Sequence, residues 1–275
     1  MQTLALANQK GGCGKTTVAI NAANALADRG ERVLLIDLDP QAHATLGLGQ
    51  ADFAGVSVAD VFDGRASLSK VARVVRPGLS LVPGSLALSE FEERAEQMVR
   101  PEGTLEAALE DVAPLYDWVV LDCPTRADGV VAANAVRAAS LVILVVETGA
   151  FALQGALRAR ELFSALARAN DRELELRVLA TLFDSSRPLS RELLIGIHAR
   201  FGGEMFDTVI HVAEELREAI AYGVPVAEFA PDSAATRQFR ALADELALWA
   251  DAREAPPAPF ASAAGELPTP ISGGA

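Results

Sequence analysis

The architecture follows from nine residues near the N-terminus, Gln9-Lys10-Gly11-Gly12-Cys13-Gly14-Lys15-Thr16-Thr17. An apolar run at 4–7 precedes them and predicts a short buried strand, and a helical pattern of apolar residues begins near Lys15. Such a strand, glycine-rich loop and helix N-terminus form a phosphate cradle, because glycines let backbone N–H groups turn inward and the helix end carries partial positive charge. The sequence therefore predicts a phosphate-binding loop made of Gly11, Gly12, Cys13, Gly14, Lys15, Thr16 and Thr17.

Two side chains of this loop suit a nucleotide and its metal. Lys15 is expected to reach the β- and γ-phosphates, and the Thr16 hydroxyl is expected to ligate Mg²⁺. Gln9 stands where the general pattern G-x-x-x-x-G-K-[ST] has its first glycine, and a second lysine, Lys10, comes directly before two glycines. The form K-G-G-x-G-K-T is the deviant Walker A motif.

Three aspartates follow two further apolar strands. Asp122 ends the strand predicted at 118–121, and Asp37 and Asp39 follow the strand predicted at 33–36. Open α/β sheets bind ligands at the carboxyl ends of their strands. We therefore expect Asp122 to hold a Mg²⁺-bound water and Asp37 to support the metal or the loop. The alternatives are an aspartate that merely caps a loop at 122 and an ordinary turn aspartate before a proline at 39.

The remaining sequence alternates between apolar runs and helical patterns. This alternation predicts an α/β fold, a three-layer sandwich with a mostly parallel central sheet, and the phosphate loop makes it a fold of the P-loop NTPase type. One domain is expected over 1–253, followed by a disordered Pro/Ala/Gly-rich tail over 254–275. Besides a loop at 41–55, the pattern predicts strands at 79–82, 141–146, 176–182 and 205–210 and helices at 56–62, 86–99, 104–112, 130–138, 153–169, 189–201, 213–221 and 234–250.

Composition narrows the class of protein. The 275 residues include 22% charged and 51% hydrophobic residues, with a net charge of −13, which is typical of a soluble globular protein. We expect a cytoplasmic location, because no apolar run approaches the ~18 residues of a membrane span and no signal peptide is visible. The net charge argues against a broadly basic DNA-binding surface and leaves a local basic patch open. Cys13 and Cys123 are interpreted as small packing residues rather than metal ligands.

Three ordered motifs make the chain resemble the ParA/MinD family of P-loop ATPases, and most closely its ParA branch. They are the phosphate loop at 8–17, the segment Val33-Leu34-Leu35-Ile36-Asp37-Leu38-Asp39-Pro40-Gln41 and the segment Trp118-Val119-Val120-Leu121-Asp122-Cys123-Pro124. Weaker similarity continues through 151–155, 206–210 and 222–226, so the resemblance covers roughly residues 1–250.

The resemblance implies an ATPase that uses ATP and Mg²⁺ and that is slow until a partner stimulates it. Its catalytic residues would be Lys10, Lys15 and Asp39, with Asp39 positioning the attacking water. Lys10 would cross a dimer interface to the phosphates bound by the other subunit, much as an arginine finger does. Dimerisation would then depend on ATP. The metal site implied is Thr16, Asp37 and Asp122.

The resemblance also implies an ATP-dependent homodimer that drives chromosome or plasmid partitioning with a ParB-like partner, in the cytoplasm or on the nucleoid. Nonspecific DNA binding stays open, although the basic positions of the family are occupied here by Val212, Glu215 and Ser186. A patch could still form from the remaining basic residues, which could equally be solvated helix charges paired with glutamate: Arg187, Arg191, Arg217, Arg237 and Arg240. Membrane binding is not expected, because the last helix is acidic on its polar positions and a proline-rich tail follows it.

Three other functions remain open. A ParA-like ATPase could position a protein cargo or regulate an assembly without binding nucleoid DNA. A metabolic P-loop enzyme resembling dethiobiotin synthetase would use ATP to phosphorylate or activate a small acid, for which Lys10 and the D-L-D-P-Q stretch at 37–41 are a poor match. A purely structural nucleotide-binding role is disfavoured by the presence of Asp39.

Overall fold

A computed structural model describes residues 1–51, 55–95, 101–126, 128–169 and 173–254. Its core is a seven-stranded sheet with the strand order β3-β4-β2-β5-β1-β6-β7. Every neighbouring pair is parallel except β3 and β4. The α/β class and the mostly parallel sheet are therefore confirmed. The strands are β1 (Gln2–Ala7), β2 (Val33–Asp37), β3 (Arg73–Arg76), β4 (Leu79–Val82), β5 (Trp118–Asp122), β6 (Leu141–Glu147) and β7 (Leu176–Thr181).

The central strands are apolar without interruption because both faces of the sheet are covered. Successive side chains of a strand point to opposite faces, and β1 shows the consequence. Ala5 and Ala7 belong to one hydrophobic cluster, whereas Leu4 and Leu6 belong to another on the opposite face. The sheet thus lies between two separate apolar layers, as the sequence predicts.

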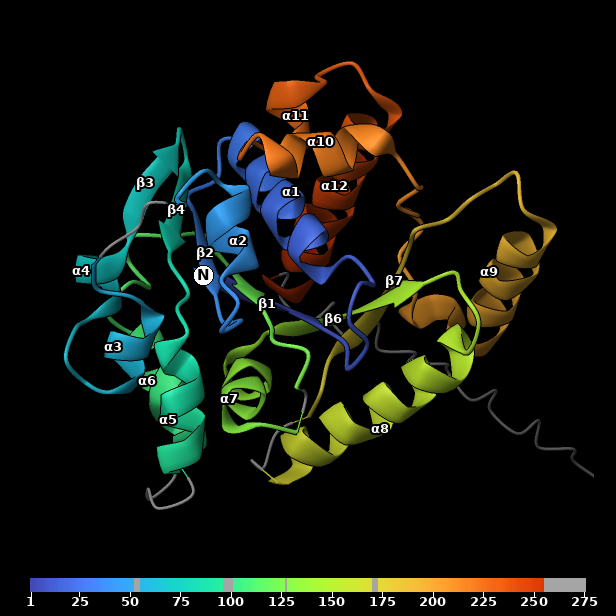
Figure 1. Ribbon diagram of the computed structural model, residues 1–275. Coiled ribbons are helices and arrows are strands. Elements are labelled where there is room, and N and C mark those ends of the chain that lie inside the picture. The colour runs from blue at the N-terminus through green and yellow to red at the C-terminus, as the bar shows by residue number, and fades with distance from the viewer. Residues whose placement is uncertain (52–54, 96–100, 127, 170–172, 255–275) are drawn as a thin grey trace, which may run out of the picture.

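Helices form the two outer layers (Figure 1). One side is covered by α1, α10, α11 and α12, and α1 and α12 pack against each other. The other side is covered by α3, α5, α6, α7 and α8. The helices are α1 (Lys15–Asp28), α2 (His43–Gly47), α3 (Val58–Phe62), α4 (Leu68–Val71), α5 (Ala87–Ala95), α6 (Thr104–Leu109), α7 (Val130–Ala138), α8 (Ala152–Ala169), α9 (Pro188–Phe201), α10 (Glu214–Ala221), α11 (Val226–Phe229) and α12 (Ala234–Glu254).

The strand predicted at 205–210 is wrong. This segment follows the edge of β7 through isolated contacts: Phe206 N–H donates to Val178 O at 3.0 Å and Ile210 N–H donates to Ala180 O at 2.9 Å. Between these two contacts, the backbone N–H groups of Asp207 and Thr208 donate to the Glu245 carboxylate on α12 instead of to β7. Side-chain competition for backbone donors prevents a continuous ladder.

Other differences lie in short elements. The loop predicted at 41–55 contains α2, and α4, β3 and α11 have no counterpart in the prediction. Strand β3 is a partly exposed edge strand with arginine at both ends, which carries little of the apolar signal that marks the central strands. The last residues predicted for the helix at 86–99, and the predicted tail beyond the end of α12, lie outside the described residues. None of the described helices is both long and apolar enough to cross a membrane.

Candidate nucleotide-binding site

The loop between β1 and α1 has the backbone that a phosphate cradle needs. Gly12 and Gly14 have positive φ angles of 75° and 94°, a conformation that favours glycine. The Thr181 hydroxyl at the end of β7 donates to Cys13 O at 2.7 Å and pins the loop to the sheet. Among the described residues, no side chain caps the N-terminus of α1 and no acidic residue lies in its first turn. Its first N–H groups are thus available to an anion.

Lys15 lies under this loop and is almost fully buried, with 6% of its surface exposed. Its Nζ donates a hydrogen bond to Lys10 O at 3.1 Å, across the base of the loop. The loop therefore combines a side-chain cation with backbone donors, a combination that binds phosphate.

Two carboxylates lie side by side at the edge of the sheet, because Asp37 of β2 is in register with Asp122 of β5. Both residues are fully buried. Asp37 accepts hydrogen bonds from Thr45 N–H at 2.8 Å, from the Thr45 hydroxyl at 2.7 Å and from Asp39 N–H at 3.2 Å. Its carboxylate thus holds Asp39 and Thr45 of α2 in place.

Asp122 differs from its neighbour, because neither of its carboxylate oxygens accepts a hydrogen bond of normal geometry within the described part of the chain, although the Thr16 hydroxyl is close enough to lower its pKa. Burial raises the pKa of Asp122 well above its ordinary value, and the adjacent Asp37 carboxylate raises it further. Burial likewise raises the pKa of Asp37 to about 6. A buried carboxylate without a partner is costly, and oxygen ligands are what Mg²⁺ prefers. The Asp122 carboxylate beside Thr16 therefore fits a divalent cation.

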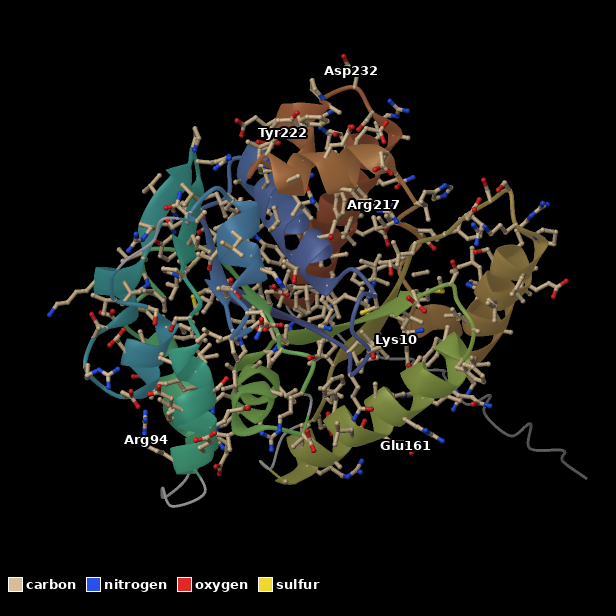
Figure 2. All side chains as sticks on the ribbon, in the orientation of Figure 1. Lys10, Arg94, Glu161, Arg217, Tyr222 and Asp232 are labelled. Carbon is tan, nitrogen blue, oxygen red and sulfur yellow. The ribbon has the colours of Figure 1, made fainter. Side chains whose placement is uncertain are left out.

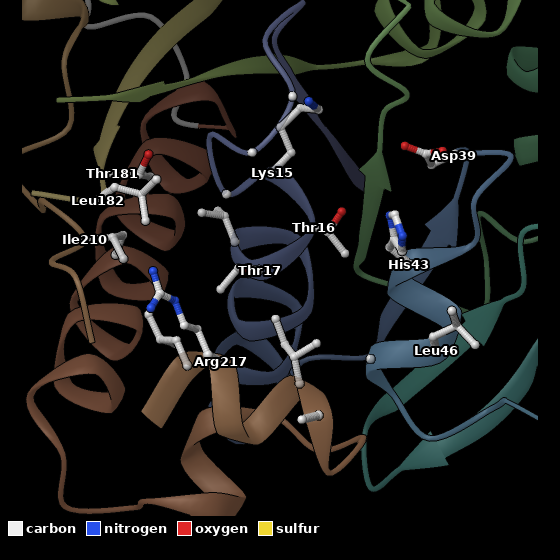
Figure 3. Close-up of a pocket in the computed structure, with 18 of the residues that line it drawn as sticks. Lys15, Thr16, Thr17, Asp39, His43, Leu46, Thr181, Leu182, Ile210 and Arg217 are labelled. Carbon is white, nitrogen blue, oxygen red and sulfur yellow. The ribbon is translucent and has the colours of Figure 1, made fainter. Parts of the chain in front are cut away.

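A cavity of about 940 Å³ opens from the phosphate loop (Figure 3). It runs past the first turn of α1 to a region between α2 and α10. Asp39, whose Oδ1 accepts a hydrogen bond from Gln41 N–H at 2.8 Å, lines it on one side. The lining residues that the sequence prediction singles out are Gly11, Gly12, Gly14, Lys15, Thr16, Thr17 and Asp39. The structure thus brings the predicted loop and Asp39 to one cavity.

Lys10 has a different position, because it does not belong to the residues that line this cavity. Its Nζ forms an ion pair with the Glu147 carboxylate at the end of β6. The Lys10 side chain is 48% exposed and that of Glu147 is 19% exposed. Lys10, the lysine that distinguishes the deviant motif, is thus ion-paired with Glu147 outside the cavity of its own subunit.

Several lining residues are not among those predicted for the nucleotide site, although Arg217 is one of the basic residues considered above for a DNA-binding patch. His43 begins α2, and Figure 3 shows it on the same side of the cavity as Asp39. Leu182 follows β7 directly and has a positive φ of 51°, and Ile210 is the last residue of the irregular segment beside β7. Arg217 of α10 points toward the cavity in Figure 3. No sequence motif marks these residues as part of the nucleotide site. Only their place in the chain could have predicted them, because they lie beyond the carboxyl ends of strands or in elements with a weak hydrophobic pattern.

The two cysteines behave as packing residues. Cys13 and Cys123 are buried free thiols, and burial is the main cause that raises the pKa of each. In the described ranges, no group of three or more His, Cys, Asp or Glu side chains is arranged to hold a metal ion. The Mg²⁺ site considered above differs from such a cluster, because it needs one carboxylate and one hydroxyl, with water and phosphate as the other ligands.

Three of the five basic residues considered for a DNA-binding patch have acidic or carbonyl partners. Arg187 pairs with Asp184 at 2.9 Å, and Arg217 pairs with Glu214 at 3.3 Å. Arg237 donates to Asp232 O at 2.6 Å. Val212, at a basic position of the family, is about half exposed. Paired surface charges contribute little free positive potential, so this face is less basic than its arginine content indicates.

The cradle, the buried carboxylate pair and the parallel sheet define a P-loop nucleotide-binding protein. A family model described as an AAA domain matches residues 1–176. The chromosome partitioning protein ParA of Caulobacter vibrioides is 35% identical over 251 residues, which cover 90% of this chain and 94% of that protein. The chromosome-partitioning ATPase Soj of Treponema pallidum is 31% identical over 89% of this chain and 96% of that protein. The chain belongs to the ParA/MinD family of P-loop ATPases.

A solved structure agrees with this assignment of fold. The structure described as cobyrinic acid a,c-diamide synthase from Mycobacterium smegmatis, with a bound ATP analogue and magnesium, superposes with a TM-score of 0.80 at 30% identity. The match covers 93% of this chain and 98% of that one. The P-loop fold expected from the sequence is confirmed by this likeness.

Proposed function

We propose that the protein is a ParA-type ATPase, a switch that dimerises when it binds ATP and separates after hydrolysis, and that it drives chromosome or plasmid partitioning with a ParB-like partner. Two relatives at 31–35% identity are described as chromosome-partitioning proteins. The observation that carries the proposal is the buried, unpartnered carboxylate of Asp122 beside an uncapped helix N-terminus. A cation would satisfy the carboxylate and an anion would satisfy the helix end, and Mg²⁺–ATP supplies both.

In this proposal, Lys15 and the backbone from Gly11 to Thr17 bind the phosphates, and Thr16 and Asp122 hold the metal. The metal would neutralise charge on the phosphates. Lys15 is buried and is fixed by its hydrogen bond to Lys10 O, so its charge needs no rearrangement to act on the phosphates. Preorganised charge of this kind stabilises a transition state at little cost in reorganisation. Asp37 keeps the loop at Asp39 and Thr45 in place.

Asp39 is the residue we assign to the attacking water. Of the three aspartates at this sheet edge, it is the one that lines the cavity, whereas Asp37 and Asp122 are fully buried. One Asp39 oxygen accepts a hydrogen bond from Gln41 N–H, which fixes the direction of the carboxylate. A carboxylate held in this way can orient a water molecule and accept its proton.

Lys10 is assigned to the other subunit's ATP. The Lys10 side chain is about half exposed and lies outside its own cavity, which suits a group that acts across an interface. Charge supplied from a second subunit would make hydrolysis depend on dimerisation. The two events would then form one switch.

A synthase activity, as in the name of the M. smegmatis neighbour, receives less support. A synthase that used a cysteine as its nucleophile would need a reactive thiolate. Both cysteines of this chain are buried with raised pKa values, which opposes that chemistry.

A second candidate is a ParA-like ATPase that positions a protein cargo. It is favoured by the paired arginines and by Val212, Glu215 and Ser186 at the basic positions of the family. DNA binding across a salt series separates the two functions. For partitioning, we expect the ATP-bound Asp39→Ala protein to bind nonspecific DNA with an affinity that falls steeply with salt and disappears without ATP.

The matched controls for this experiment are two arginine variants. Arg217→Glu should weaken DNA binding and reduce the salt dependence, whereas Arg65→Glu, a half-exposed residue after α3 that pairs with Asp60, should change neither. Absence of binding at about 50 mM salt, with the ATP-dependent dimer intact, would contradict partitioning on DNA and favour the protein cargo.

A further inference from the structure

The ion pair between Lys10 and Glu147 joins the phosphate loop to the end of β6. We propose that Glu147 is a positioning residue that restrains the Lys10 side chain within its own subunit and must release it before two subunits can close around ATP. Glu147 would thereby set the protein concentration at which ATP-loaded subunits dimerise. This inference rests on the proposed function, in which Lys10 acts on the ATP of the other subunit.

The carboxylate of Glu147 is held in a defined place. The next residue, Thr148, is fixed to β7 by its N–H, which donates to Thr181 O at 3.0 Å, and by its hydroxyl, which donates to Leu182 O at 3.1 Å. Gly149 leaves room for the glutamate, because a Cβ at this glycine would come within 2.6 Å of the Glu147 Oε1 atom. A side chain larger than hydrogen at 149 would displace the carboxylate from Lys10.

The backbone of Lys10 is held separately from its side chain. Lys10 N–H donates to Asn8 Oδ1 at 3.0 Å, and Asn8 Nδ2 donates to Val145 O at 2.7 Å. Lys10 O accepts from Lys15 Nζ. The loop therefore stays attached to β6 and Lys15 when the ion pair opens. Release of Lys10 can move one side chain without disturbing the phosphate cradle of its own subunit.

Glu147 and the phosphates of the other subunit compete for the single ammonium group of Lys10. Lys10 Nζ cannot neutralise Glu147 and the phosphates of another subunit at the same time. When it leaves, the Glu147 side chain, which is 19% exposed, loses an ion-pair partner while only partly solvated. Each subunit bears this cost once, so a symmetric dimer bears it twice. Binding of ATP alone would therefore not suffice for dimerisation at low protein concentration.

The variant Glu147→Gln tests whether Glu147 restrains Lys10, because the amide keeps the shape of the side chain and removes its charge. We expect the dissociation constant of the dimer to fall about tenfold, measured by sedimentation velocity with the nonhydrolysable analogue AMPPNP and Mg²⁺, which corresponds to about 1.4 kcal/mol. In ATPase assays, the protein concentration that gives half the maximal rate should fall by the same factor. The maximal rate should change by less than about twofold, a split that a general structural defect would not produce.

Two variants serve as controls. Glu228→Gln removes a comparable ion pair, with Arg76 at 2.7 Å, from α11, which lies far from Lys10 (Figures 1 and 2); it should leave the dissociation constant unchanged. Glu147→Asp keeps the charge and should resemble the wild-type protein more than Glu147→Gln does. Thermal unfolding of each variant shows that it is folded.

The outcomes separate this inference from the function on which it rests. A dimer of Glu147→Gln that is as weak as the wild-type dimer, or weaker, would overturn the restraint and indicate that Glu147 aids Lys10 in the dimer. If the wild-type protein stays monomeric with AMPPNP and Mg²⁺ at every concentration, the proposed switch itself fails and the restraint fails with it.

Discussion

Replacing Asp39 by alanine should lower the rate of ATP hydrolysis by at least about 100-fold while leaving ATP binding and dimerisation intact. Orientation and deprotonation of an attacking water by a carboxylate contribute roughly 10²–10⁴ to a rate. Asp39 lines the cavity, yet the phosphate loop, Lys15 and the Asp122 carboxylate do not depend on it for their positions. The rate is measured as phosphate release per subunit, and binding as the change in tryptophan fluorescence or calorimetric heat with Mg²⁺–ATP.

Two further variants make this result interpretable. Lys15→Ala removes the buried cation of the loop and should abolish binding as well as hydrolysis, which Asp39→Ala should not. Asp251→Ala changes an exposed aspartate of α12 and should leave the rate unchanged. If Asp39→Ala retains a rate within a few fold of the wild-type protein while Lys15→Ala abolishes it, Asp39 does not position the water.

Replacing Asp122 by asparagine should stabilise the nucleotide-free protein and remove its response to Mg²⁺–ATP. At pH 8 in EDTA, we expect the unfolding temperature to rise by about 3–10 °C, because the variant lacks a buried carboxyl group whose oxygens have no described partner. Wild-type protein saturated with Mg²⁺–ATP should gain several degrees by mass action, and the variant should gain little. Thermal unfolding with and without Mg²⁺ and nucleotide measures both effects.

The pH dependence of this difference has a definite sign. Burial raises the pKa of Asp122 in the folded state, so its contribution to stability is greatest below the ordinary carboxyl pKa and is lost as the pH rises through the folded-state pKa. The advantage of Asp122→Asn over the wild-type protein should therefore be larger at pH 8 and should shrink as the pH falls toward about 4.

The neighbouring residue Asp37 provides a matched control, because Asp37→Asn should change the unfolding temperature in the opposite direction. Asp37 is equally buried, but its oxygens accept bonds from Thr45 N–H, from the Thr45 hydroxyl and from Asp39 N–H. Asp37→Asn would turn an NH₂ group toward these donors and should lower the unfolding temperature. Stabilisation by Asp37→Asn, or destabilisation by Asp122→Asn in the absence of metal, would contradict the assignment of Asp122 to the cation.

The central sheet could be predicted because its signals are local. The runs at 33–36 and 118–121 are continuous and apolar, since both faces of these strands are buried. The segment at 205–210 shows where such signals fail. It has the composition of a strand, but the Glu245 carboxylate takes two of its backbone donors, and that glutamate lies 37 and 38 residues farther along the chain.

In the candidate site, too, residues of a local motif could be predicted, whereas contacts between distant segments could not. The residues from Gly11 to Thr17 could be predicted because the motif is contiguous. Asp37 and Asp122 carry the same sequence signal, an aspartate at the end of an apolar strand, yet only the fold shows that Asp37 is fully hydrogen-bonded and Asp122 is not. The pairing of Lys10 with Glu147 was likewise beyond sequence reasoning, because it joins residues 137 positions apart.

In the proposed switch, ATP makes two copies of this chain associate. Sedimentation velocity of the wild-type protein at one concentration, with Mg²⁺ and no nucleotide, ADP or ATP, tests it most directly. We expect a monomer without nucleotide and with ADP, and a dimer with ATP that disappears as the ATP is hydrolysed. A monomer in all three conditions, or a dimer that forms regardless of nucleotide, would contradict it.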